Sequence, residues 1–310
     1  MSTKLVQKST KIDRYDIQIL GKLLNDCRMS SRSIGSELST GGVSVQRRID
    51  KLLQLGVIED WTLKIEPGAL GRDAFIITST GINKQEMLKQ IKLVGEPYFV
   101  IPCIGDVIVC GIIVRDEIEQ KLEIVGNFMK DFKILSVFKS SEINYNAGIT
   151  KTDLQIINQL LKNPRFTASQ INEKTGISSK TIIRCINKLQ DNEAFQFTLK
   201  INPKKLVGYI LYAIVVWTRK NNRDVLNRLN GQYSNRYVQK PFLTQDQTVI
   251  FLYAQDMFEI DDTLHEIERV DGVKRTDLFI PKEVNYTNNW IEDVIDDSKF
   301  SKFHLDYQIK

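Results

Sequence analysis

The stretch S39-T-G-G-V-S-V-Q-R-R-I-D-K-L52 places two adjacent glycines before a serine and two arginines. Two structures have this composition. A glycine-rich loop followed by polar and basic residues is typical of a phosphate-binding loop in a nucleotide enzyme. The tight turn that leads into the third helix of a helix-turn-helix also contains glycine. A phosphate loop follows a strand, whereas this turn follows a helix, so the surrounding sequence decides between them.

The chain contains an internal repeat. A shift of 137 positions lays residues 16–56 on residues 153–193 without a gap, and eleven of these 41 positions are identical. After a further one-residue shift, TLKIEP (62–67) matches TLKINP (198–203). We interpret the chain as a tandem duplication, in which Gly41 and Gly42 correspond to Ser178 and Ser179.

Each repeat begins with three helical patterns. Ile17, Leu20, Leu23 and Leu24 recur at helical spacing behind Asp13, a candidate N-cap. A short second helix carries Ile34, and third helices are predicted at 43–55 and 179–191. Residues 57–65 then alternate and predict a strand pair, or wing, that ends at Pro67. The pattern describes a winged helix-turn-helix, so the glycine pair is best interpreted as its turn.

The segments after the wings repeat a second pattern. The first runs as a strand at 73–80, a helix at 84–94, strands at 97–102 and 107–114, a helix at 116–131 and a strand at 133–143. The second gives the same order between residues 209 and 280. This βαββαβ order is typical of a ferredoxin-like sandwich. The predicted fold class is therefore α+β, with two winged helix-turn-helix domains (12–66 and 148–203) alternating with two ferredoxin-like domains (67–147 and 204–284), before a tail (285–310).

The two third helices carry basic residues on the face opposite their apolar stripe. Lys180, Arg184 and Lys188 follow i, i+4, i+8 spacing, and a basic helix of this size suits a DNA major groove. Solvated surface charge is the alternative for a single stripe; two aligned stripes favour DNA. A double substitution of Arg184 and Lys188 is expected to weaken DNA binding. The candidate DNA-binding residues are Ser44, Gln46, Arg47, Arg48, Lys51, Ser179, Lys180, Thr181, Arg184 and Lys188.

The strings I12-D-R-Y-D-I-Q-I-L20, I49-D-K-L-L-Q-L-G-V-I58 and I65-E-P-G-A-L-G71 resemble the opening of Lrp/AsnC transcriptional regulators. The string L264-H-E-I-E-R-V-D-G-V-K-R-T-D-L278 resembles the end of that family's ligand-sensing (RAM) domain. The resemblance implies a DNA-binding regulator whose sandwich domains pair, as a homodimer or as a pseudo-dimer within the chain. It also implies a candidate amino-acid effector site at the turns between the second and third strands, with Gly105, Asp106, Thr244 and Asp246.

Composition restricts the remaining classes. The net charge is +5, and basic residues are concentrated in the helical segments, with 11 Lys/Arg against 8 Asp/Glu in residues 1–66 and 10 against 4 in residues 150–205. No apolar run reaches the length of a membrane span, and the first residues lack the apolar core of a signal peptide. The four cysteines show no metal-ligand spacing. We expect a cytoplasmic protein with double-stranded DNA as its partner, and without a metal or other cofactor.

Two other functions stay open. A siroheme decarboxylase shares the same architecture, sometimes in tandem, but that family uses histidine and arginine in its sandwich strands. The only histidines here are His265 and His304, while Trp217 and Arg236 keep the possibility open. No nucleophile or metalloprotease motif occurs, so we expect no catalytic residue. The second alternative is an interaction protein that kept the fold and lost DNA binding. Such a protein would have an apolar or mixed outer face on its third helices, and only Val43 and Ile183 point to one. Beyond the repeat, Trp290, Ile291 and Val294 fit a tail that docks on a sandwich or on another subunit; a disordered acidic tail is the alternative.

Overall fold

A computed structural model describes residues 11–115, 118–128, 133–139, 148–219, 222–243 and 247–300. The chain divides into two compact units, and each unit joins segments that are far apart in the sequence. One unit consists of Met1–Asp60 and Leu199–Glu283, and the other of Trp61–Thr198 and Val284–Lys310. Each unit therefore combines the three helices of one repeat with the sandwich of the other, an arrangement that the linear order of the segments does not indicate.

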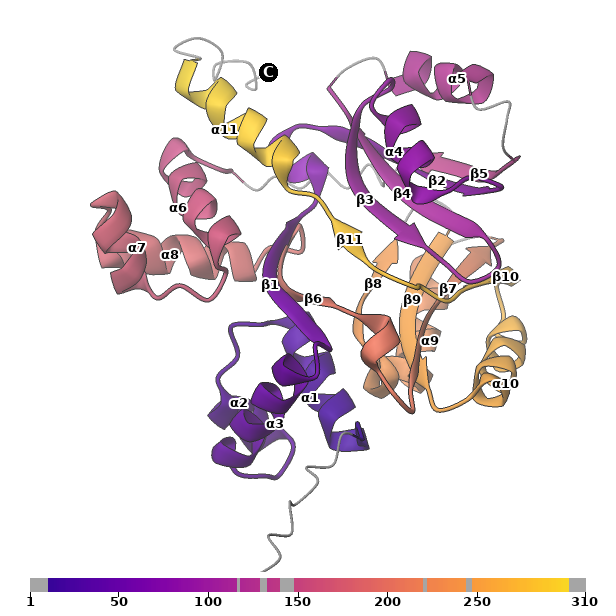
Figure 1. Ribbon diagram of the computed structural model, residues 1–310, viewed down its shortest axis with the longest axis horizontal. Helices are drawn as coiled ribbons and strands as arrows, with labels where there is room; N and C mark the ends of the chain where they lie inside the picture. The colour runs from indigo at the N-terminus through magenta and orange to yellow at the C-terminus, as the bar shows by residue number, and fades with distance from the viewer. Residues whose placement is uncertain are drawn as a thin grey trace, which may run out of the picture. The chain divides into compact units, whose positions relative to one another are not determined.

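The first group of three helices is α1 (Arg14–Asn25), α2 (Ser31–Glu37) and α3 (Gly42–Gln54) (Figure 1). Asp13 caps α1 as predicted: its carboxylate accepts the Asp16 N–H, and the Asp16 carboxylate accepts the Asp13 N–H. The two bonds form a capping box, which satisfies donors at the helix start that have no partner within the helix. The apolar stripes of the three helices are buried against one another: Ile17, Leu20, Leu23, Ile34, Val45, Ile49 and Leu52.

The second group repeats this arrangement with α6 (Lys151–Lys162), α7 (Ala168–Thr175) and α8 (Ser179–Gln190). Thr150 and Asp153 form the equivalent capping box at the start of α6. The predicted third helices at 43–55 and 179–191 are confirmed to within one residue at each end. The buried apolar stripe of α8 is Ile182, Ile186 and Leu189.

The two helix-turn-helix turns share one backbone feature. Ser39 has a φ of 52° and Gly176 a φ of 71°, and the 137-residue shift lays one on the other. Both residues adopt the left-handed conformation, in which glycine is unstrained and serine is not. The first repeat therefore makes with serine a turn for which the second uses glycine.

The wings differ from the predicted strand pairs. Residues Ile58–Ile65 form one continuous strand, β1, because no turn residue interrupts them, and β6 (Phe195–Ile201) is its counterpart. β1 and β6 form a two-stranded sheet. In one unit Asn202 N donates to Val57 O, and in the other Glu66 N donates to Ala194 O.

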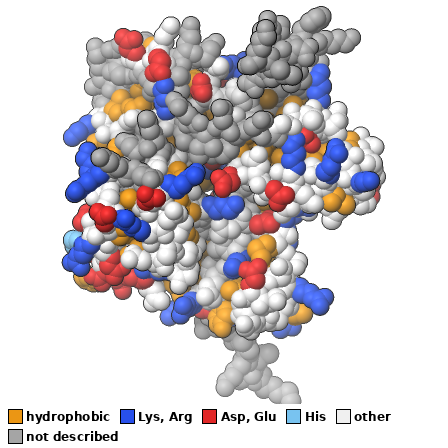
Figure 2. Space-filling model, turned by 180° about the vertical axis from the view of Figure 1, so that it is seen from behind, with side chains coloured by type: hydrophobic (Ala, Val, Ile, Leu, Met, Phe, Trp, Pro, Cys, Tyr) orange, Lys and Arg blue, Asp and Glu red, His pale blue; other side chains and the backbone are white. Residues whose placement is uncertain are grey.

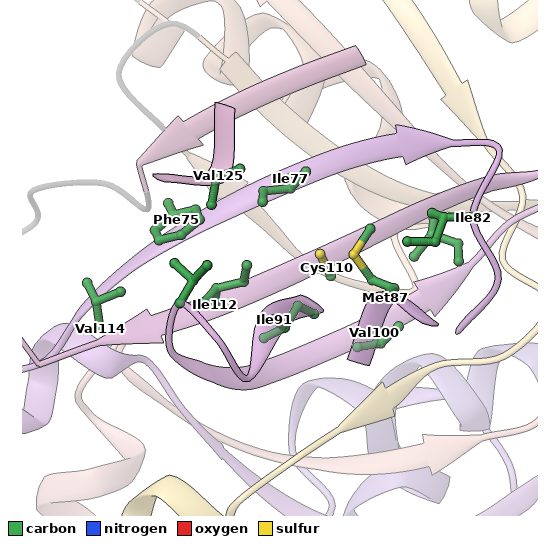
Figure 3. Packing of buried hydrophobic residues seen from close by; sticks show 12 residues of the cluster. Phe75, Ile77, Ile82, Met87, Ile91, Val100, Cys110, Ile112, Val114 and Val125 are labelled. Atoms are coloured by element: carbon green, nitrogen blue, oxygen red, sulfur yellow. The ribbon is translucent and has the colours of Figure 1, made fainter. Parts of the chain in front are cut away.

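The first sandwich has a helical layer on one face of an antiparallel sheet. Its core joins Phe75, Ile77 and Ile112 of the sheet to Met87 and Ile91 of the helix above it (Figure 3). The strand order is β11-β3-β4-β2-β5, so the βαββαβ unit has the order of a ferredoxin-like fold with one added strand. The elements are β2 (Asp73–Thr80), α4 (Lys84–Ile91), β3 (Glu96–Pro102), β4 (Val107–Val114), α5 (Ile118–Phe128) and β5 (Lys133–Lys139).

The second sandwich has the same topology, in the order β10-β7-β9-β8. Ile214, Val216 and Leu252 of its sheet pack against Val225, Leu229 and Ile260 of its helices. The elements are β7 (Ile210–Thr218), α9 (Asn222–Tyr233), β8 (Gln239–Leu243), β9 (Gln247–Ala254), α10 (Met257–Glu268) and β10 (Val273–Phe279). The short 3-10 helices among the described residues are η1 (Pro67–Leu70), η2 (Pro203–Lys205) and η3 (Ser234–Arg236). The predicted α+β class is confirmed.

The segment after the second sandwich docks on its own chain. β11 (Asn285–Tyr286) pairs with the edge strand β3, and α11 (Asn289–Phe300) packs against α6 (Figure 1). Trp290 and Ile291 are buried, with 3% and 0% of their surface exposed. Of the two alternatives for the tail, docking on a sandwich is confirmed for residues 285–295, whose side chains the structure describes.

Candidate nucleic-acid interface

The buried stripe of α3 determines which of its side chains face outward. Val45, Ile49 and Leu52 are each at most 1% exposed, so the helix cannot rotate without exposing its core contacts. Ser44, Gln46 and Arg47 are consequently exposed. The Gln46 amide is held by two neighbours: its oxygen accepts from Ser31 Oγ at 2.6 Å, and its nitrogen donates to Asp50 Oδ1 at 2.9 Å.

The two glycines before α3 have different roles. Gly41 is the N-cap and makes no side-chain cap bond, and a Cβ on it would meet nothing within 4 Å. A Cβ on Gly42 would lie 3.0 Å from Arg32 Cα, closer than most Cβ contacts, so the close approach of α2 favours a glycine there. The first N–H groups of α3 have no acceptor within the helix and carry its positive dipole end, which suits a DNA phosphate.

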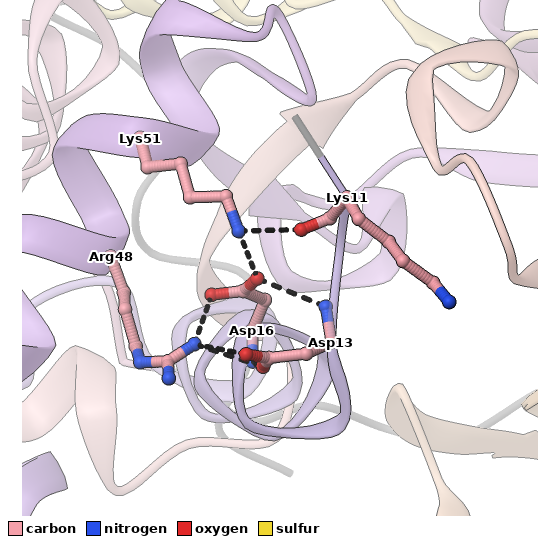
Figure 4. Close-up of polar contacts among 5 residues, drawn as sticks. All are labelled: Lys11, Asp13, Asp16, Arg48 and Lys51. Atoms are coloured by element: carbon pink, nitrogen blue, oxygen red, sulfur yellow. Dashed lines mark hydrogen bonds and ion pairs between the residues drawn. The ribbon is translucent and has the colours of Figure 1, made fainter. Parts of the chain in front are cut away.

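Arg48 and Lys51 point away from the outer face and toward α1 (Figure 4). Arg48 Nη1 lies 2.8 Å from Oδ1 of Asp16, and Lys51 Nζ lies 2.7 Å from its Oδ2. The Asp16 side chain is fully buried, so both of its oxygens are neutralised by α3. Lys51 also donates to Lys11 O, and Arg48 to Asp13. These two cations therefore fasten α3 to α1.

Asp13 lies at the outer edge of this cluster. Partial burial would raise the pKa of its carboxyl, but the Arg48 hydrogen bond, the Asp16 N–H and the nearby charges of Arg48 and Lys51 together lower it. The carboxylate is thus held ionised by the same helix that it anchors.

In the second group, α8 begins with a side-chain cap. Ser178 Oγ accepts from Thr181 N at 3.3 Å and lies 2.9 Å from Thr181 Oγ1. The cap satisfies a helix donor that Gly41 leaves to solvent in the first group. Thr181 is therefore engaged at the helix start, whereas Ser179 is exposed.

The outer face of α8 presents Lys180 and Arg184, one turn apart and both exposed. Neither side chain has a hydrogen bond or salt bridge to another residue in the described part of the chain. Lys188, the third member of the predicted stripe, instead lies 2.8 Å from Asp153 Oδ2 and donates to Gly148 O. The outward stripe of α8 is shorter than the helical wheel indicated, because the long side chain of Lys188 reaches α6.

Asp153 and Cys185 form the buried side of this contact. Burial would raise the pKa of Asp153, but hydrogen bonds from Lys188 and Thr150 lower it to about 2. Burial and the neighbouring Asp153 carboxylate raise the pKa of the Cys185 thiol to about 12. The thiol therefore remains protonated at neutral pH and is unsuited to nucleophilic chemistry.

Two further cations of the second group were not among the DNA-binding residues predicted from the sequence. The guanidinium of Arg165 stacks 4.3 Å from the ring centroid of Trp61, and Lys174 lies 5.3 Å from the ring centroid of Phe166. Arg165 is identical to its equivalent in the first repeat, Arg28, and this identity could have singled it out in the sequence. On the lobe formed by α6–α8, at the right of Figure 2, Lys and Arg side chains lie among hydrophobic ones.

The candidate effector residues are only partly described. Gly105 and Asp106 form the turn between β3 and β4 with φ values of 81° and 58°, and Thr80 Oγ1 donates to Asp106 O at 2.9 Å. Thr244 and Asp246 lie outside the described residues. Within the described ranges no group of three or more His, Cys, Asp or Glu is placed to hold a metal ion. Those ranges likewise contain no helix that is long and apolar enough to cross a membrane.

Comparisons with known proteins agree with this geometry. The family model described as winged helix-turn-helix DNA-binding matches residues 149–193, which contain α6–α8. The chain is 29% identical over 152 residues to an uncharacterized HTH-type transcriptional regulator of Pyrococcus abyssi, which covers 49% of this chain and 95% of that protein. It is 29% identical over 124 residues to the HTH-type transcriptional regulator LrpA of Pyrococcus horikoshii, with 37% and 84% covered. The Bacillus subtilis regulator LrpC is 33% identical over 76 residues, with 24% and 53% covered.

Among solved structures, the siroheme decarboxylase NirDL matches 92% of this chain and 99% of its own at 12% identity, with a TM-score of 0.46. Bacillus subtilis LrpC matches 42% of this chain and 92% of its own at 21% identity, with a TM-score of 0.31. Similarities of this size say nothing about activity. The resemblance to Lrp/AsnC regulators is confirmed by the sequence matches, each of which spans at most about half of this chain.

Proposed function

We propose that this chain is a sequence-specific DNA-binding transcriptional regulator with two DNA-reading helices, α3 and α8. The observation that carries the proposal is the outer face of α8. Its exposed Lys180 and Arg184 lie opposite a fully packed apolar stripe, in the segment matched by a winged helix-turn-helix DNA-binding model. A rigidly held helix with outward cations can enter a major groove and neutralise the phosphates on either side.

The candidate residues divide into two roles under this proposal. Lys180, Arg184 and Arg47 contact phosphate or guanine, Ser44, Gln46 and Thr181 contact base edges, and Ser179 contacts the backbone through the helix start. Arg48, Lys51 and Lys188 hold the helices in place through Asp16 and Asp153 and contact DNA only secondarily. The distinction rests on the ion pairs of the second set.

The sandwich domains are proposed to set the spacing of the two reading helices, by pairing within the chain or across a homodimer. We also propose that the exposed turn at Gly105 and Asp106 belongs to an amino-acid effector site. Calorimetric titration of the protein with amino acids tests the second point. Binding that is weakened by Asp106→Ala is expected, and the absence of heat with every amino acid would remove the effector from the proposal.

We assign no catalytic residue to the chain, in keeping with regulator relatives. The enzymatic alternative predicts that an iron tetrapyrrole binds. We expect no shift in the absorption spectrum when one is mixed with the protein, and a saturable shift would reopen that alternative.

The DNA-binding proposal is tested with Lys180→Ala/Arg184→Ala. Both side chains are exposed, so the double variant is expected to fold like the wild type. Its affinity for a selected DNA site should fall, and the slope of log K against log salt should decrease by about 1 to 2, because each lost phosphate contact removes close to one released counterion. The matched control is Lys89→Ala/Lys92→Ala, in the last turn and at the C-cap of α4, which removes the same charge from another exposed surface. Equal losses in the two variants, or no loss in either, would contradict the proposal.

A further inference from the structure

The two reading helices differ at one equivalent exposed position. Each helix is anchored by a matching buried triplet, Val45, Ile49 and Leu52 in α3 and Ile182, Ile186 and Leu189 in α8. The 137-residue shift that aligns these triplets also lays Gln46 on Ile183. Both side chains are exposed, so the same place on each helix offers different chemistry to whatever the helix contacts.

Gln46 offers a fixed amide. Ser31 occupies one acceptor position of its oxygen and Asp50 one of its two N–H groups. An amide oxygen has two lone pairs and the nitrogen two hydrogens, so one acceptor and one donor remain. This pair complements the N6–H donor and N7 acceptor of adenine in the major groove, and it is oriented before DNA arrives.

Ile183 offers only methyl and methylene groups. It is 51% exposed although it lies on the same helix as the buried Ile182 and Ile186. Exposed Lys180 and Arg184 flank it and can hold the helix against the phosphates of a groove. In the major groove, thymine is the base that presents a methyl group, and an apolar side chain is its natural contact.

Two neighbouring positions also differ in charge, and at both of them α8 is the more positive helix. Val43 and Asp50 of α3 correspond to Lys180 and Asn187 of α8. The outer face of α3 therefore carries one cation, Arg47, and the acidic Asp50, whereas that of α8 has two cations and no acidic residue between positions 179 and 190. Phosphate affinity favours α8, and α3 depends more on base contacts.

We propose that the two helices read unlike half-sites: α8 reads one in which a thymine methyl contacts Ile183, and α3 reads one in which an adenine contacts Gln46. The inference rests on the proposed DNA-binding function and deepens it. It makes the target of one chain an asymmetric sequence, in contrast to the inverted repeat that two identical readers select.

The test begins with selection of binding sites from random DNA by the full chain. Two non-identical halves are expected. In the half assigned to α8, replacing the contacted thymine with uracil removes only the methyl group and should weaken binding about fourfold, the effect of one buried methyl. Ile183→Ala should lose this sensitivity to uracil, while Ile183→Val should retain part of it. Uracil in the other half should change nothing.

The α3 half is tested with 7-deazaadenine, which lacks the N7 acceptor. Wild-type binding should fall about fivefold, because one bond of a bidentate contact is lost. Gln46→Ala should bind the modified and unmodified sites equally.

The possible outcomes distinguish a failure of DNA binding from a failure of the unlike half-sites. Recovery of no DNA site overturns the proposed function and this inference with it. Recovery of a site with two identical halves, or a uracil effect that persists in Ile183→Ala, overturns the inference and leaves DNA binding intact. Loss of sensitivity at both modified bases in the matching variants supports it.

Discussion

The ammonium of Lys188 lies 2.8 Å from Oδ2 of Asp153, and 137 residues earlier the ammonium of Lys51 lies 2.7 Å from Oδ2 of Asp16. In both cases a lysine near the end of the third helix neutralises a capping-box aspartate at the start of the first helix. The aspartate side chains are 11% and 0% exposed. The same contact thus fixes the orientation of each reading helix, and its removal should affect stability before recognition.

Lys188→Met keeps the apolar stem and removes the charge. The folded-state pKa of Asp153, about 2, lies below the ordinary pKa of an aspartate carboxyl. A lowered carboxyl pKa stabilises the fold above the unfolded pKa, and this contribution disappears as the pH falls through the folded one. The variant should lose about 1 to 2 kcal/mol of unfolding free energy at pH 7, and the difference from wild type should shrink between pH 4 and pH 2. Urea denaturation at several pH values measures this; a difference that does not depend on pH would contradict it.

Arg47 and Arg48 are neighbours in sequence, but we expect substitution of Arg48 to reduce stability and substitution of Arg47 to reduce DNA binding. Arg48→Ala removes hydrogen bonds to two carboxylates, one of them buried, and should lower the unfolding free energy by about 1 to 3 kcal/mol. Arg47→Ala removes an exposed side chain and should change stability by less than about 0.5 kcal/mol while weakening DNA binding. Thermal denaturation and DNA titration on both variants separate the two roles. If Arg47→Ala proves the more destabilising, the assignment of roles is wrong.

Gly41 and Gly42 provide a second neighbouring pair. Gly41→Ser adds a cap where the φ is −78° and nothing lies within 4 Å, so it should stabilise the protein by a few tenths of a kcal/mol, roughly 0.5. Gly42→Ser places a Cβ 3.0 Å from Arg32 Cα and should destabilise it by about 1 to 3 kcal/mol. The melting temperatures of the two variants should therefore move in opposite directions. Movement in the same direction would show that the turn differs from the one described.

The docked tail contributes to its unit through Trp290. The indole meets the Tyr98 ring edge-on at 6.4 Å, and Thr287 N donates to Tyr98 O, which continues the pairing of β11 with β3. Trp290→Ala should lower the unfolding free energy by about 3 kcal/mol because it leaves a cavity under α11. Hydrogen exchange should become faster in β3, while that of β8 in the other unit serves as the internal control. Unchanged protection of β3 would indicate that the tail contributes little there.

The same tail covers an edge strand. Removal of residues after Glu283 should expose the outer hydrogen-bonding edge of β3 and promote association between molecules. Sedimentation velocity of the truncated chain should show larger species at increasing concentration. Trp290→Ala, which keeps β11, should associate less; equal association of both would place the cause elsewhere than the strand edge.

Local pattern in the sequence predicted the helices of the two helix-turn-helix groups and the strands and helices of the two sandwiches, but not the single-stranded form of the wings or the strand and helix of the tail. Hydrophobic spacing gave the third helices to within a residue, because a stripe at Val45, Ile49 and Leu52 can be buried only by a helix in one phase. This stripe places Gln46 and Arg47 on the exposed side of α3, and the equivalent stripe of α8 places Ile183 and Arg184 on its exposed side. The βαββαβ order followed from strand and helix periods in the same way.

The helical wheel was less informative for the long cations. It placed Lys51 and Lys188 on the outer side of their helices. A lysine side chain is long enough to reach a neighbouring helix, and each of these two donates to an aspartate 35 residues away in the sequence. A signal for this was present: Asp16 with Asp153 and Lys51 with Lys188 are identical pairs of the repeat. Two identical pairs with the same spacing are consistent with the same contact in both segments.

The two helix-turn-helix groups, the two sandwiches and the outward chemistry of α3 and α8 could be predicted from the amino-acid sequence, since each depends on periodicity within a short segment. Contacts between distant segments make Arg48, Lys51 and Lys188 anchors, crowd the position of Gly42 but not that of Gly41, and add the tail to the sheet at β3. They also place each group of three helices in one unit with the sandwich of the other repeat. These outcomes depend on contacts between residues far apart in the chain, and no local pattern of charge or hydrophobicity specifies which distant surface is met.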